Sequence, residues 1–241
     1  MYVLNDTGER MIPPASNEVS FVFARRRFAY EYASQFAVNQ TILDIGCGTG
    51  YGSELLAKIA RFVYGIDYNM DAIRFCQNNY SHRNCLFIPM NAEHIGLKTQ
   101  FDVTVALQVI EHLSNIHAFF QEIKRVTKPF GLIIFSTPNV PAKIQQKGKN
   151  PFHTAQFDYA AFKAVLQKEF AEWVVVGVTY KSPNIIRTML QSSPLYQLGK
   201  LFNRRSRIKK TADIFMKLRE FTIDEMHPET ALDFIALCKN R

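Results

Sequence analysis

A regular alternation of short apolar runs with amphipathic stretches constrains the fold of this chain more than any other feature. Runs rich in β-branched and aromatic residues predict strands at 41–46, 61–68, 84–90, 101–110, 131–138, 172–180 and 231–240. Helical spacing of apolar residues predicts helices at 21–38, 51–60, 70–80, 115–127 and 158–169. Apolar strands that alternate with helices form a largely parallel sheet covered on both faces. We therefore predict a single α/β domain with a doubly wound sheet.

The net charge of +8 belongs to one segment of the chain. Between Lys181 and Arg219 there are ten Lys and Arg residues against one acid, so the remaining residues sum to about −1. The sequence has no signal-peptide pattern and no apolar run long enough to span a membrane. The cysteines at 47, 76, 85 and 238 lack metal-like spacing. We therefore expect a cytoplasmic protein with reduced thiols.

Three glycines on alternate positions in "TILDIGCGTGYG" (41–52) follow the first predicted strand and precede a helix. Glycine permits positive φ and close approach of the backbone to a ligand, and the helix that follows offers free N–H groups. A tight turn without a ligand is the alternative. The spacing G-x-G-x-G differs from the G-x-G-x-x-G that faces a dinucleotide pyrophosphate.

Two acids end the first two predicted strands. Asp44 lies two residues before the first glycine, where a carboxylate accepts from an ammonium or hydroxyl and repels a diphosphate. Asp67 ends the next strand, where an acid can accept from both ribose hydroxyls of a nucleoside, or simply form a turn. Together they favour a nucleoside ligand with an amino-acid end and no phosphate.

Five motifs, "ILDIGCGTG", "VYGIDYN", "NAEHI", "FDVTVALQVIEHL" and "RVTKPFGLIIFSTPN", resemble those of class I S-adenosylmethionine-dependent methyltransferases over about residues 40–140. The resemblance implies a Rossmann-like, seven-stranded mixed sheet with S-adenosylmethionine as cofactor. It also implies which residues bind each part of the cofactor. The methionine part would be held by Asp44, Gly46, Cys47, Gly48 and Gly50, and the ribose by Asp67. The adenine would lie against Tyr68, Asn91 and Ala92, and the sulfonium above Leu107 and Gln108.

The motifs "VIEHL" and "STPN" resemble ubiquinone-type O-methyltransferases of the methyltransferase type 11 group and methyltransferases encoded beside glycan-assembly enzymes. The flanking "TGERMIP", "RRRFAYEYA", "NPFHTAQF" and "ALDFIALCKN" look like the second group. The resemblance then implies O-methylation of a sugar or other glycan-pathway intermediate. The alternatives are a small phenolic or quinone precursor, the ribose 2′-oxygen of RNA, or a non-catalytic relative that binds the cofactor.

Glu111, His112 and His153 are the predicted catalytic residues, because a sugar hydroxyl has a high pKa and needs a base or a metal. They also resemble three ligands of an E-x-x-E-H metal site with a later histidine. Gln108 replaces the first acid of that pattern and is a weak neutral ligand, so we assign no metal site. A divalent ion, a general-base histidine and a role limited to capping the next helix all stay open.

We divide the chain into an N-terminal arm and lid helix (1–39), a cofactor-binding core (40–182), a helical basic insertion or cap (183–225) and a final strand (226–241). In the lid helix we expect Phe28 and Tyr32 to pack inward and the arginines at 25–27 to lie in water, with contact to an acidic substrate as the alternative for the arginines. Within the insertion, "LGKLFNRRSRIKK" (198–210) fits a solvated helix, an anionic membrane surface or lipid-linked sugar, or RNA.

Overall fold

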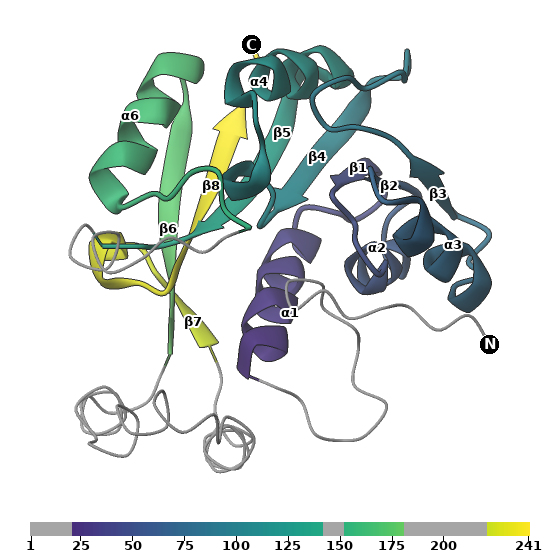
Figure 1. The fold of residues 1–241 in the computed structure, drawn as a ribbon, viewed down its shortest axis with the longest axis horizontal. Helices are drawn as coiled ribbons and strands as arrows, with labels where there is room; N and C mark the ends of the chain where they lie inside the picture. Colours follow the sequence, from purple (N-terminus) through teal and green to yellow (C-terminus); the bar gives the residue numbers. More distant parts are fainter. Residues whose placement is uncertain (1–20, 142–151, 181–220) are drawn as a thin grey trace.

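The computed structural model describes residues 21–141, 152–180 and 221–241. In these residues a single sheet of eight strands runs in the order β3-β2-β1-β4-β5-β8-β6-β7 (Figure 1). The strands are β1 Thr41–Ile45, β2 Phe62–Asp67, β3 Cys85–Pro89, β4 Phe101–Leu107, β5 Thr127–Pro138, β6 Trp173–Tyr180, β7 Phe221–Asp224 and β8 Asp233–Lys239.

The first five strands pair in parallel, and the last three make antiparallel pairs. Strand β8 lies between β5 and β6 and runs opposite to both, so Asp233 pairs with Pro138 at the end of β5. Because of this direction, the beginning of β8 lies at the edge of the sheet where β4 and β5 end. That edge is where ligands bind in open α/β sheets.

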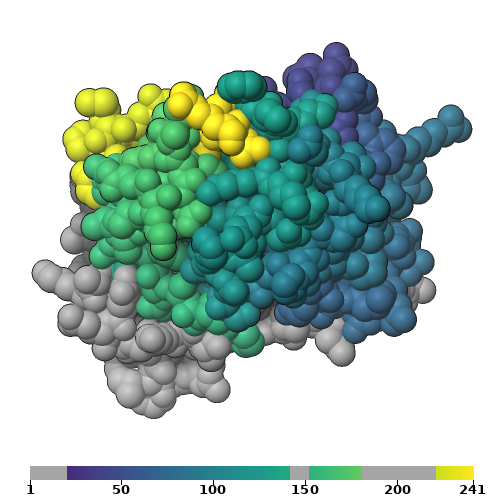
Figure 2. Space-filling model, turned by 90° about the horizontal axis from the view of Figure 1, so that it is seen from above, coloured from purple at the N-terminus to yellow at the C-terminus, as the bar shows by residue number. Residues whose placement is uncertain are grey.

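Helices cover both faces of the sheet, as the alternation in the sequence predicts. One face packs against α4 Ile116–Val126 and α6 Tyr159–Glu169, and the other against α1 Phe21–Ser34 and α2 Tyr51–Ala57. Helix α3 Met70–Asn79 packs on Phe87 in a smaller cluster. Neighbouring residues of β1 alternate between the faces: Ile42 joins one core cluster and Leu43 the other. Figure 2 shows the early helices and strands (blue) and the later ones (green and yellow) on opposite sides of the molecule.

Side-chain caps fix where three of the helices begin. Asn69 accepts hydrogen bonds from the backbone N–H groups of Asp71 and Ala72, which is the typical role of an N-cap residue. Asn115 and Asp158 cap α4 and α6 in the same way. Each cap satisfies donors that the first turn of the helix leaves without a partner.

The class of fold predicted from the sequence is confirmed, but two details differ. The sheet of the described residues has eight strands instead of seven, because Phe221–Asp224, which we placed in the insertion, pair with β6 as its edge strand. The strand predicted at 101–110 ends at Leu107, and Ile110–His112 form a 3₁₀ turn. The residue after the strand, Gln108, has φ 59°, which turns the chain out of the extended conformation.

Some predictions fall outside the described residues. These are the arm at 1–20, the loop segment 142–151 and residues 183–220 of the predicted insertion, which include the basic stretch 198–210. Among the residues that are described, no helix has the length and apolar content that a membrane crossing requires.

Candidate functional site

The glycine loop adopts a backbone that residues with side chains rarely take. Gly46, Gly48 and Gly50 have φ values of 69°, 54° and 78°. A Cβ on Gly46 would lie 2.5 Å from Val109, and one on Gly50 would lie 2.7 Å from the sulfur of Cys76. A Cβ on Gly48 would meet no protein atom within 4 Å. Two glycines are therefore needed for packing, whereas Gly48 leaves open space where a ligand can approach the backbone.

Asp67 at the end of β2 holds the loop in place. Its carboxylate accepts hydrogen bonds from the N–H of Gly48 at 2.9 Å and from the N–H of Asn69 at 2.8 Å. Cys47 adds a backbone hydrogen bond to Ile66. The acid predicted to bind ribose thus lies directly beside the glycine that has open space next to it.

Asp44 is fully buried beneath the loop, where its carboxylate accepts from the hydroxyls of Ser53 at 2.6 Å and Tyr30 at 3.1 Å. Burial raises the pKa of Asp44 to about 7, although both hydrogen bonds lower it. Gly52 makes this arrangement possible, because a Cβ there would overlap the Tyr30 ring. Sequence reasoning missed Tyr30 and Ser53; the tyrosine on the first helix offered the only signal.

The residues predicted to surround adenine lie near the same edge of the sheet. Tyr68, directly after β2, is 82% exposed. Asn91 follows β3 and accepts from the N–H of Glu93, and Ala92 packs against the larger core. The roles of these three residues in binding adenine stay predictions. The exposed position of Tyr68 would allow its ring to cover the adenine.

Gln108 lies at a strained point where β4 ends. Its φ of 59° is uncommon for a residue with a side chain, and such strain concentrates at functional sites. Ser136 on β5 holds it: the Gln108 N–H donates to the hydroxyl at 3.1 Å and the side-chain amide donates at 3.3 Å. Leu107, one residue earlier, is buried and pairs with Ser136. Both predicted sulfonium-side residues therefore lie at the carboxyl end of β4.

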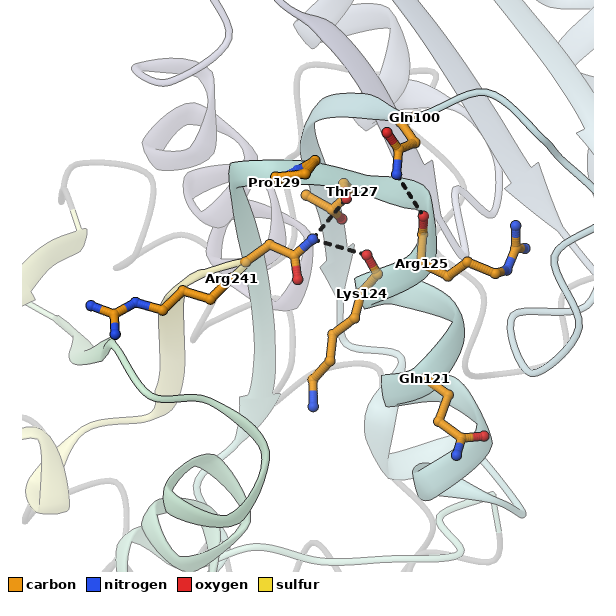
Figure 3. Close-up of a pocket in the computed structure, with 8 residues that line it drawn as sticks. Gln100, Gln121, Lys124, Arg125, Thr127, Pro129 and Arg241 are labelled. Carbon is orange, nitrogen blue, oxygen red and sulfur yellow. Dashed lines mark hydrogen bonds between the residues drawn. The ribbon is translucent and has the colours of Figure 1, made fainter.

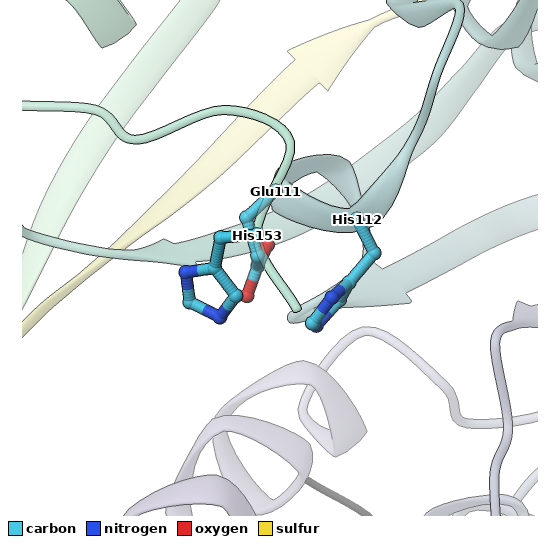
Figure 4. A group of neighbouring side chains, drawn as sticks. All are labelled: Glu111, His112 and His153. Carbon is cyan, nitrogen blue, oxygen red and sulfur yellow. The ribbon is translucent and has the colours of Figure 1, made fainter. Parts of the chain in front are cut away.

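The structure brings the three predicted catalytic residues together (Figure 4). One side-chain N or O atom each from Glu111, His112 and His153 all lie within 4.8 Å of one another, and the two imidazole centroids are 4.9 Å apart. The loop that carries His153 is fixed because the N–H and hydroxyl of Thr154 donate to the carbonyl of Glu111.

The hydrogen bond of His112 defines which ring nitrogen is available. Its Nδ1 lies 2.8 Å from the carbonyl oxygen of Phe152. A carbonyl only accepts, so Nδ1 carries the proton and, in the neutral ring, Nε2 has the lone pair. His112 can therefore accept a proton or bind a metal through Nε2.

Glu111 is 1% exposed, and neither carboxyl oxygen has a hydrogen-bond partner of normal geometry. Burial raises the pKa of Glu111 to about 8, while Arg26 and the nearby Thr137 hydroxyl lower it. Thr137 lies close enough to act on this pKa but is not aligned for a full hydrogen bond. The carboxyl group is consequently protonated for the most part at neutral pH.

Arg25 and Asp233 form an ion pair that the sequence did not predict. Arg25 Nε lies 3.0 Å from Asp233 Oδ2, with the side chains 18% and 4% exposed. The expectation that Arg25 lies in water is therefore wrong, because its guanidinium is ion-paired with the buried Asp233 at the beginning of β8. Phe28 and Tyr32 do pack inward, partly buried against the core. An acid at the start of an otherwise apolar strand, in "ALDFIALCKN", was the available signal.

A separate pocket of about 490 Å³ lies at the opposite edge of the sheet (Figure 3). It includes Thr127 at the beginning of β5 and Gln100 just before β4, far from the glycine loop. Two of its cations, Lys124 and Arg125, already pair with Glu169 and Glu122. This pocket lacks the groups that the predicted cofactor needs.

Comparison with known proteins identifies the glycine-loop segment. Residues 43–135 match the family described as "Methyltransferase domain". A "Probable S-adenosylmethionine-dependent methyltransferase" of Mycolicibacterium smegmatis is 33% identical over 168 residues, which are 67% of this chain and 63% of that protein. A ubiquinone biosynthesis O-methyltransferase of Glaesserella parasuis is 34% identical over 110 residues, 42% of this chain and 47% of that protein. The chain thus matches less than two thirds of the length of either relative.

A solved structure supports the fold over a wider part of the chain. The S-adenosylmethionine-dependent methyltransferase of Thermotoga maritima, described as a possible histamine N-methyltransferase, superimposes with a TM-score of 0.60 at 17% identity. The match covers 91% of this chain and 92% of that structure. Residues 43–135, which build the glycine-loop edge, thus match a methyltransferase domain, and together with the similar S-adenosylmethionine-dependent methyltransferases and the shared fold they support assignment to the class I S-adenosylmethionine-dependent methyltransferases.

Proposed function

We propose that this protein transfers the methyl group of S-adenosylmethionine to a hydroxyl oxygen of a sugar or other glycan-pathway intermediate. The observation that carries this proposal is the His112 ring, whose Nδ1–H donates to a carbonyl so that Nε2 can accept the proton of a hydroxyl. A hydroxyl acceptor needs such a base, because its pKa is far above neutral.

The glycine loop and Asp67 suit the cofactor. Gly48 leaves open space beside its backbone, and the carboxylate of Asp67 lies 2.9 Å from the Gly48 N–H at the end of β2. In this proposal Asp67 accepts from the ribose hydroxyls, and Asp44 supports the loop from below through Ser53 and Tyr30. When bound, S-adenosylmethionine supplies an electrophilic methyl group on its sulfonium.

The chain's own residues then orient the acceptor and move one proton. His112 receives the hydroxyl proton at Nε2 as the oxygen forms its bond to the methyl carbon. His153, with its ring 4.9 Å away, and the buried Glu111 confine the acceptor at the end of β4. Positioning and exclusion of water supply much of the rate in such a transfer.

A metal-assisted variant of this reaction is favoured by the mutual approach of Glu111, His112 and His153. Their candidate ligand atoms lie within 4.8 Å of one another, so small side-chain movements would bring them to bonding distance of one ion. Two imidazoles and a carboxylate suit Zn²⁺ or Mn²⁺. Such an ion would lower the pKa of the acceptor hydroxyl.

The other candidate acceptor is a small phenolic or quinone precursor. It is favoured by the similarity to the ubiquinone biosynthesis O-methyltransferase, which is confined to 110 residues. That similarity covers 42% of this chain, and His153 and Asp233 lie outside the family match at 43–135. We place the sugar first because the flanking motifs of the sequence resemble methyltransferases encoded beside glycan-assembly enzymes.

Calorimetric titration with S-adenosylmethionine and S-adenosylhomocysteine tests the cofactor assignment, repeated after EDTA and with added Mn²⁺ or Zn²⁺. We expect micromolar binding of both nucleosides. A heat of metal binding in the wild type that disappears in His153→Ala would support the metal-assisted reaction. No heat of metal binding in the wild type would favour His112 as the base. Incubation with phenolic and sugar acceptors, read by mass spectrometry for a gain of one methyl, then separates the acceptor classes. Cofactor binding without transfer to either class would favour a non-catalytic relative.

A further inference from the structure

Buried hydrogen-bond acceptors without donors gather beside the predicted catalytic residues. They are Oδ1 of Asp233, Oε1 of Gln108 and the carbonyl oxygen of the protonated Glu111 carboxyl group, each with almost no exposed surface. Buried polar atoms in folded proteins nearly always have a partner, because an unmet one costs about 1–3 kcal/mol. Several of them at one place indicate that a ligand brings the missing donors.

The three residues lie at one edge of the sheet because of its topology. Gln108 follows β4, Glu111 lies in the 3₁₀ turn just after it, and Asp233 begins the antiparallel β8. They are close enough to affect one another: Gln108 lowers the pKa of Asp233, and Asp233 raises that of Glu111. The three side chains thus lie near one another at the edge of the sheet that also carries His112.

The charges at this surface restrict the ligand that fits. An anion would bring more acceptors and leave the buried oxygens unmet. A cation would be repelled by Arg25, which pairs with Asp233 at 3.0 Å, and by Arg26, whose charge acts on both acids. Neutral donors such as hydroxyl groups satisfy the acceptors without either conflict.

The two acids would hold different hydroxyls. Glu111 lies with His112 and His153, where the reacting hydroxyl is expected. Asp233 is ion-paired with Arg25 and lies next to Gln108 at the same edge of the sheet. We propose that Asp233 and Gln108 form a subsite for a second hydroxyl, adjacent to the methylated one, so that the enzyme selects vicinal diols. This inference rests on the proposed function and names the acceptor class that the site selects.

Binding of matched small probes to the full chain, saturated with S-adenosylhomocysteine, tests the subsite. The sugar-like pair is 1,4-anhydroerythritol, a ring with two adjacent hydroxyls, and 3-hydroxytetrahydrofuran, which has one. The aromatic pair is catechol and phenol. Saturation-transfer NMR titrations give the affinities of the four probes. A preference for the diol in the sugar-like pair indicates a sugar-like acceptor, and a preference for the diol in the aromatic pair indicates a phenolic one.

In the wild type, the diol of at least one pair should bind about 10-fold more tightly than its monohydroxy analogue, as expected for one hydrogen bond to a charged group. Asp233→Asn should abolish that preference while the affinity for S-adenosylhomocysteine stays unchanged. Asp102→Asn is the matched control, since Asp102 is also ion-paired but lies at the opposite end of β4. If Asp233→Asn does not fold, Arg25→Gln, which removes the other half of the pair, should abolish the preference instead.

Equal affinity of diol and monohydroxy probe in both pairs, or no binding of either diol, would overturn the inference. So would an Asp233→Asn protein that keeps the preference. Methyl transfer to the probes is measured separately by mass spectrometry. A diol that binds through Asp233 but gains no methyl would leave the subsite standing and count against the proposed function.

Discussion

Gly48→Ala separates the folding role of the glycine loop from its binding role. Gly48 has φ 54°, and a Cβ there would meet no protein atom within 4 Å. The only folding penalty is the backbone strain of a non-glycine residue in the left-handed region, about 1–2 kcal/mol. For a chain of this size each kcal/mol lowers Tm by about 2–4 °C. The new methyl group would stand in the space that we assign to the cofactor, so the affinity for S-adenosylhomocysteine should fall by at least about 10-fold.

Two further glycines make this prediction specific. Gly46→Ala places its Cβ 2.5 Å from Val109 and should reduce stability well beyond the effect of Gly48→Ala. Gly96→Ala also meets open space, but without a positive φ, and should change neither property. Thermal unfolding and calorimetric titration measure the two properties on the same samples. A Gly48→Ala protein that loses stability but binds the nucleoside like wild type would show that the open space is not the cofactor site.

Three other changes test the remaining parts of the site. Asp67→Ala should abolish cofactor binding, because it removes the predicted ribose acceptor and the anchor of the loop, whereas Asp71→Ala on exposed α3 should not; equal titrations would refute the assignment. His112→Ala should lower kcat by about 10²-fold or more with little change in cofactor affinity. An unchanged rate on an acceptor that the wild type methylates would show that His112 is not the base. The pKa of Glu111 is raised to about 8, so between about pH 4.5 and 8 this carboxyl group is protonated in the folded chain and ionised in the unfolded one. The free energy of unfolding should therefore fall as pH rises through that window, by up to about 1.4 kcal/mol per pH unit. Urea titrations should show that slope diminished in Glu111→Gln, and an identical slope in the variant would contradict the assigned pKa.

The cofactor side of the molecule was largely predictable, because its determinants are local in sequence. A glycine that needs positive φ and an acid that ends a strand are both visible in a stretch of a few residues, as with Gly48 and Asp67. The same applies to Asn69, whose cap on α3 is formed with residues two and three positions away. Parallel strands joined by helices then bring these stretches to one edge of the sheet.

The acceptor side could be predicted only in part, because its contacts join distant parts of the chain. His112 and His153 were both predicted to be catalytic, and the hydrogen bond from the Thr154 N–H to the Glu111 carbonyl shows what holds their two segments together. The pair of Arg25 and Asp233 spans most of the chain and depends on β8 running antiparallel to β5. Strand β7 was missed because four residues of mixed exposure carry too little periodicity to distinguish them from a loop.

The place of β8 in the sheet has a consequence for the order in which the protein can fold during its synthesis. Strand β8 is made after the other strands that the structure describes and lies between β5 and β6, so those two strands have no partner on their facing sides until Asp233–Lys239 have left the ribosome. Until then β5 ends a five-stranded parallel sheet with an open edge, to which other chains could pair. The beginning of β8 also carries Asp233, so the same late event that closes the sheet completes the acceptor side of the site.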